Sequence, residues 1–121
     1  MKMRTWAMTP TTDTKEAVAR LEAKLRGWKL GKYETSYGGF YLEEPAESTG
    51  DGFTEWHDLL NHTSAEGERW FAEQLRLMVA PNRKGWTVAG SVYRVQVSHE
   101  SRSEAICLAI ESAALQEPAD A

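Results

Sequence analysis

The chain has 121 residues, of which 41% are hydrophobic and 26% are charged, a composition typical of one globular domain. Its 18 acidic and 14 basic side chains give a net charge of −4, which disfavours direct nucleic-acid binding and polybasic membrane binding because both need a positive surface. A single cysteine, Cys107, excludes an intramolecular disulfide and a cysteine-based zinc cluster and suits a reducing compartment. No run approaches the length of a membrane span and the N-terminus lacks a secretory pattern, so we expect a cytoplasmic protein.

The first half of the chain predicts a helix, a hairpin and a second, shorter helix. Apolar residues recur at helical spacing over residues 13–26, and Gly27 is typical of a helix C-terminus. Two short strands follow within residues 28–44, joined at Gly38-Gly39 and stopped by Pro45. Residues 46–52 have the composition of a loop, and the apolar residues within 53–60 predict a short helix.

The second half predicts a helix, another hairpin and a final helix. The capping box Thr63-x-x-Glu66 starts a helix whose apolar arc runs to Met78, with Pro81 just beyond its end. Residues 86–88 and 92–98 predict two strands. The capping box at Ser101 starts the last helix. The tryptophans within the apolar patterns are predicted to lie in the core: Trp28, Trp56, Trp70 and Trp86.

This order of elements predicts an α+β fold, a small layered domain in which a mostly antiparallel sheet of about four strands, in two hairpins, is packed by three to four helices. Residues 1–121 form one domain, with a flexible arm at about 1–11 and a tail at about 116–121. The polar side chains Arg94, Gln96 and Ser98 favour a sheet covered on one face. Leu108 and Leu115 lie on the polar side of the last helix, where another element or a partner would cover them.

Three segments resemble the small phage-encoded proteins of the phage ABA-sandwich domain family. They are Leu25-Arg26-Gly27-Trp28, Gly85-Trp86-Thr87-Val88, and the strand at residues 93–97 followed by Ser103-Glu104-Ala105-Ile106-Cys107-Leu108-Ala109. The resemblance covers most of the chain as an order of elements and roughly thirty residues as matching text. It implies a layered α/β domain of a phage or prophage, placed in the host cytoplasm, with no established activity and no catalytic residues. A three-layer sandwich would need both faces of the sheet covered.

The middle of the chain is strongly acidic, because residues 34–73 carry ten acidic side chains and one basic one, Arg69. The predicted partner surface consists of the acidic residues together with the leucine pair: Glu43, Glu44, Glu47, Asp51, Glu55, Asp58, Leu108 and Leu115. The spacing of the acids is not that of a calcium loop. The first hypothesis is a non-catalytic accessory protein that binds a host or phage protein. The leucine pair is equally consistent with a homodimer through the last helix and with a covering strand or helix of the same chain.

A second hypothesis is a protein that binds or sequesters a small ligand such as a nucleotide. Its candidate contacts are aromatic rings and two cations: Trp6, Tyr33, Tyr37, Tyr41, Arg83 and Lys84. An enzyme ranks third and would rest on His57, His62 and Cys107. The histidines lack further metal ligands at a recognised spacing and lack an adjacent nucleophile, and acidic neighbours oppose a Cys107 thiolate. We therefore predict no catalytic, metal-binding or cofactor-binding residues.

Overall fold

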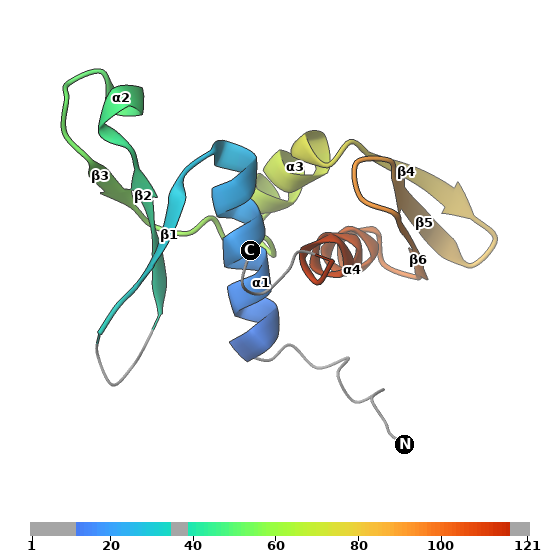
Figure 1. Cartoon of the computed structure of the whole chain (residues 1–121). Coiled ribbons are helices and arrows are strands. Elements are labelled where there is room, and N and C mark those ends of the chain that lie inside the picture. The colour runs from blue at the N-terminus through green and yellow to red at the C-terminus, as the bar shows by residue number, and fades with distance from the viewer. Residues whose placement is uncertain (1–11, 35–38, 117–121) are drawn as a thin grey trace.

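Two three-stranded antiparallel sheets lie at opposite ends of the computed structural model, which describes residues 12–34 and 39–116 (Figure 1). Sheet A has the order β1-β2-β3 and sheet B the order β4-β5-β6. The strands are β1 (Lys29–Lys32), β2 (Phe40–Glu44), β3 (Glu55–His57), β4 (Leu77–Asn82), β5 (Gly85–Gly90) and β6 (Val95–His99). The helices are α1 (Thr12–Arg26), α2 (Ala46–Thr49), α3 (Ala65–Gln74) and α4 (Arg102–Ala114). The α+β prediction is confirmed, whereas the single sheet of about four strands is wrong.

Helix α4 is the centre of the core. It contacts all three strands of sheet B as well as α1 and α3, and six of its residues are buried, which are Ala105, Ile106, Ala109, Ile110, Ala113 and Ala114. Phe71 of α3, Leu21 of α1 and Val88 of β5 are fully buried against them. Sheet A lies outside this cluster, beyond α1 (Figure 1).

The predicted capping residues lie at the ends of α1 and α4, and α3 begins one residue later than predicted. The Ser101 side chain accepts a hydrogen bond from the Glu104 backbone N–H at the start of α4, and Gly27 follows α1 with a left-handed φ of 76°. Helix α3 begins one residue later than predicted, because Ser64 and not Thr63 accepts the bond from the Gly67 N–H. Both residue types are common N-caps, with serine somewhat preferred over threonine.

Each predicted hairpin gains a third strand that the sequence analysis assigned to a helix or a loop. Residues 53–60 form no helix: β3 pairs along β2, and its three residues alternate between the faces of sheet A. Residues 46–52 include the four-residue helix α2. Helix α3 ends at Gln74, and the segment predicted to continue it is β4, which pairs along β5 over all six residues. Pro81 is tolerated there because β4 is an edge strand.

The polar residues predicted on one face of sheet B, Arg94, Gln96 and Ser98, are exposed, while Val95 is buried. Within the ranges 12–34 and 39–116, no helix is both long and apolar enough to cross a bilayer. The predicted arm at 1–11 and most of the predicted tail lie outside the described residues.

Candidate functional site

Sheet A has one face that packs on the helices and one that faces solvent. Leu42 is fully buried on the inner face, where His57, its partner in β3, stacks on the Trp28 ring at a centroid distance of 4.6 Å. Because successive side chains of a strand point to opposite faces, Tyr41 and Glu43 of β2 and Trp56 of β3 share the outer face. Helix α1 contacts β1 and β2, while Tyr33 and Trp56 on the outer face are exposed.

Three aromatic rings form a row on this outer face. The Tyr33 and Tyr41 rings lie 4.8 Å apart between centroids, and the Tyr41 and Trp56 rings lie 4.8 Å apart as well. Trp56 is 64% exposed. The Tyr41 ring lies directly over Gly31 in β1, where any Cβ would approach a ring atom within 2.2 Å. Gly31 therefore makes room for the ring. The row runs from Tyr33, directly after β1, across Tyr41 in β2 to Trp56 in β3.

Carboxylates border the aromatic row. Glu43 accepts a hydrogen bond of 3.2 Å from the Trp56 indole Nε1, and residues 43–58 carry six acidic side chains and no Lys or Arg. We call Tyr33, Tyr41, Glu43 and Trp56 the aromatic-acidic face. One cation shares it, since Lys29 is the cross-strand partner of Glu43.

The remaining acidic residues of the predicted partner surface lie on and around α2 and β3. Glu44 accepts a hydrogen bond from Ser48 and lies 2.9 Å from His57 Nε2, and these two contacts, Ser48 first, lower the pKa of Glu44. Asp51 accepts from Thr49 Oγ1 and from the Phe53 N–H, which lowers the pKa of Asp51. Glu47, Glu55 and Asp58 are exposed. These side chains keep the outer end of sheet A negatively charged at neutral pH.

Of the predicted ligand contacts, the structure brings Tyr33 and Tyr41 together and separates them from the cations. Arg83 and Lys84 form the turn between β4 and β5 in sheet B, at the other end of the molecule (Figure 1). Trp6 and Tyr37 lie outside the described residues. A single small ligand therefore reaches the tyrosines or the two cations, but not both.

Trp56 is predicted to lie in the core, but its side chain is exposed. Trp70 and Trp86 are partly buried against the core, whereas Trp28 is partly buried beside His57 and outside the core cluster. Trp56 alternates with Glu55 and His57 along a strand and points outward. The alternation of polar and apolar side chains over residues 55–57 indicates a strand, but the spacing from Trp56 to Leu59 and Leu60 also fits a helix. Leu108 of α4 is half-buried, and Leu115, which follows α4, is exposed. Only one residue of the predicted leucine pair is therefore exposed.

The histidines and Cys107 separate into two clusters. His57 lies with Glu44 and Glu55 in sheet A, while His62 and Cys107 meet at Glu111 of α4. His62 Nε2 is 2.9 Å from Glu111 Oε2, and the Cys107 thiol donates to the same oxygen at 3.4 Å. Burial and then the Glu111 carboxylate raise the pKa of Cys107 to about 12. Because a nucleophilic cysteine needs a lowered pKa, this thiol is poorly placed for covalent catalysis.

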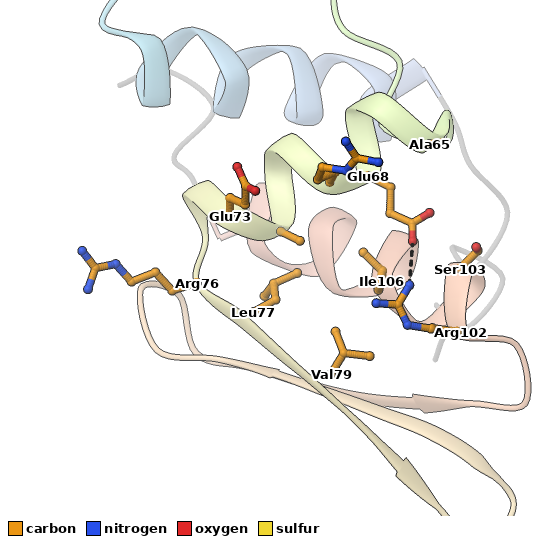
Figure 2. A pocket seen from close by; sticks show the side chains of 11 residues that line it. Ala65, Glu68, Glu73, Arg76, Leu77, Val79, Arg102, Ser103 and Ile106 are labelled. Atoms are coloured by element: carbon orange, nitrogen blue, oxygen red, sulfur yellow. Dashed lines mark ion pairs between the residues drawn. The ribbon is translucent and has the colours of Figure 1, made fainter.

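A groove of about 770 Å³ lies between α3, α4 and β4 (Figure 2). Its charged lining is mixed, with three arginines and two glutamates: Arg69, Arg76, Arg102, Glu68 and Glu73. Arg102 reaches Glu68 at 3.7 Å across the groove, as the dashed line in Figure 2 shows. This mixture of opposite charges, with one pair already formed, does not make an anion-binding pocket.

Comparison with known proteins supplies no relative. No protein-family model matches the chain, no curated protein matches it, and no solved structure matches the fold.

Proposed function

We propose that this chain is a non-catalytic protein-binding domain whose aromatic-acidic face takes an arginine-rich segment of a partner protein. The observation that carries the proposal is the exposed Trp56 ring, held in the aromatic row by Tyr41 and hydrogen-bonded to Glu43. A large exposed ring that is fixed in place, rather than free to rotate, costs little conformational entropy when a partner covers it.

Arginine fits this face better than other cationic or apolar partners. Its planar guanidinium stacks on aromatic rings, a contact that stabilises by about 0.5–1 kcal/mol at exposed sites and about 2 kcal/mol when desolvated. The same group donates parallel hydrogen bonds to a carboxylate, which Glu43 offers beside the Trp56 ring. Successive rings at 4.8 Å centroid spacing allow an extended peptide to place more than one side chain on the row.

The surrounding charge favours the same partner. Six acidic side chains without a Lys or Arg between residues 43 and 58 attract a cationic segment and accelerate its encounter at low ionic strength. Lys29, beside Glu43 on the same face, opposes this attraction locally. With the resemblance to the phage ABA-sandwich family, the proposal extends to an accessory role in which the partner is a host or phage protein.

The test uses fluorescence anisotropy of a labelled nonapeptide of alternating arginine and glycine, titrated with the full chain. We expect saturable binding that weakens with salt. Trp56→Ala should weaken it by about three- to thirtyfold, which corresponds to the loss of one cation–π contact. Lys29→Gln should tighten binding, because it removes a like charge from the face.

The matched control is Met78→Ala in sheet B, since Met78 is 76% exposed and far from sheet A. This variant should bind the peptide as the wild type does. No binding by the wild type, or equal weakening by Trp56→Ala and Met78→Ala, would overturn the proposal. Binding of an acidic peptide of the same length with equal affinity would also overturn it.

A further inference from the structure

Three potential metal ligands from distant parts of the sequence converge beside α4. His62 Nε2, Cys107 Sγ and a Glu111 carboxylate oxygen all lie within 4.8 Å of one another. The His62 and Glu111 side chains are only 15% and 14% exposed. From this geometry we propose that His62, Cys107 and Glu111 bind a zinc ion.

The present distances are close to those of a tetrahedral zinc site. Zinc binds sulfur at about 2.3 Å and nitrogen or oxygen at about 2.0–2.2 Å, so ligand atoms around it lie about 3.3–3.8 Å apart. The distances from Glu111 Oε2 are 2.9 Å to His62 Nε2 and 3.4 Å to Cys107 Sγ. The spacing i, i+4 places Cys107 and Glu111 on the same side of α4. The distance between Glu111 Oε2 and His62 Nε2 would lengthen by about half an ångström to admit the ion, and the distance to Cys107 Sγ already lies within this range.

His62 is held toward α4 by a loop that is fixed at several points. The buried Glu22 side chain accepts a hydrogen bond of 2.9 Å from the Leu60 N–H. Asn61 Oδ1 accepts from the Thr63 N–H, and the Asn61 carbonyl oxygen would lie 1.9 Å from a Cβ placed on Gly67. The His62 ring also meets Phe71, a fully buried core residue, edge to face. The site is thus preorganised before an ion binds.

The site has an open side. A cavity of about 380 Å³ between α1 and the loop before α3 is lined by His62 and Glu111. Three protein ligands next to a cavity leave a fourth position for water or a small molecule, as in zinc sites that exchange ligands. On binding, the Cys107 thiol releases its proton to solvent, and the thiolate and the carboxylate together neutralise the charge of the ion.

In the other cluster, the ligand atoms of Glu44, Glu55 and His57 also lie within 4.8 Å of one another, but none of them is a sulfur. Thiolate ligands favour zinc over the hard cations that carboxylates bind. Glu44 and His57 are also engaged by Ser48 and by the Trp28 ring. This cluster therefore serves as the internal control.

The experiment treats the purified full chain with a chelator, removes the chelator and titrates the protein with Zn²⁺ against a chromophoric competitor. Co²⁺ is titrated in parallel, because a thiolate ligand gives cobalt a near-ultraviolet charge-transfer band. We expect one ion per chain, a charge-transfer band, and a higher melting temperature with zinc. Cys107→Ser should abolish the band, and His62→Gln should weaken zinc binding by about tenfold or more. His57→Gln should change neither.

Circular dichroism of each metal-free variant separates loss of a ligand from loss of the fold, and Cys107→Ser is the smallest change if His62→Gln unfolds the chain. The proposal is overturned if the wild type binds less than one zinc ion per chain, or if cobalt gives no charge-transfer band. It is also overturned if His57→Gln abolishes binding while Cys107→Ser leaves it unchanged.

Discussion

The buried Glu22 joins α1 to the loop before α3, and its removal should destabilise the protein strongly. The side chain is 1% exposed. It accepts hydrogen bonds from Arg26 Nε at 2.8 Å and from the Leu60 N–H at 2.9 Å. Alanine at this position would leave the Leu60 N–H without its acceptor and Arg26 without its carboxylate.

The magnitude follows from these two partners. An unsatisfied, partly buried N–H costs about 1–3 kcal/mol. Arg26 is 25% exposed and regains hydration, so the lost ion pair adds only about 0.5–1 kcal/mol. The space left by the side chain adds about 1 kcal/mol. We expect Glu22→Ala to lower the free energy of unfolding by about 3 kcal/mol and the melting temperature by about 10 °C.

Urea denaturation followed by tryptophan fluorescence measures the free energy of unfolding. The control is Glu16→Ala, which removes the same kind of i, i+4 contact to an arginine, Arg20, from a more exposed part of α1. It should change the free energy of unfolding by no more than about 0.5 kcal/mol. If Glu22→Ala costs less than about 1 kcal/mol, or no more than Glu16→Ala, the buried carboxylate does not hold the loop as argued.

Three further predictions follow from local contacts. Ser64→Ala should destabilise the protein by about 1 kcal/mol and Thr63→Ala by a few tenths, measured by urea denaturation, because Ser64 caps α3; equal costs would contradict this assignment. Ser48→Ala should raise the pKa of Glu44 toward 4.5, measured by carboxyl NMR. Because that pKa is lowered by folding, ionised Glu44 stabilises the fold above pH 4.5, and this stabilisation is lost as the pH falls through the folded-state value; an unchanged pKa in the variant would refute the Ser48 contribution. In the metal-free chain, Cys107 should react with iodoacetamide at pH 8 about thirtyfold more slowly than in urea, because its raised pKa of about 12 lowers the thiolate fraction more than it raises the nucleophilicity of the thiolate. Similar rates would contradict the shielded thiol.

Elements whose ends carry local signals were predicted from the sequence. Gly27 ends α1 and Ser101 caps α4 as expected, and the pairing of β1 with β2 follows the predicted hairpin. These features depend on residues that are neighbours in the chain. Capping bonds, left-handed glycines and tight turns form without regard to the rest of the fold, so their residue types report them directly.

The strands β3 and β4 could not be assigned in this way. In both segments the apolar residues fit a helix and a strand equally well over so short a length, and the sequence predicts Leu77 and Met78 at the end of a helix. β3 pairs with β2 across the segment that contains α2, and β4 forms a hairpin with β5 through the turn at Arg83 and Lys84. These backbone hydrogen bonds favour the strand over the helix. Because β3 pairs with β2, Trp56 lies on the outer face of sheet A and is exposed, whereas the sequence predicts it in the core.

The sequence alone determined the α+β class and the acidic middle of the chain, because composition, charge and local periodicity are properties of the chain itself. Only the tertiary structure decided that there are two sheets among the described residues. It also decided that Trp56 and Glu43 join the tyrosines, and that His62 meets Cys107 and Glu111. These contacts join residues 13 to 49 positions apart, and the packing of β3 on β2 and of the loop on α4 brings them together.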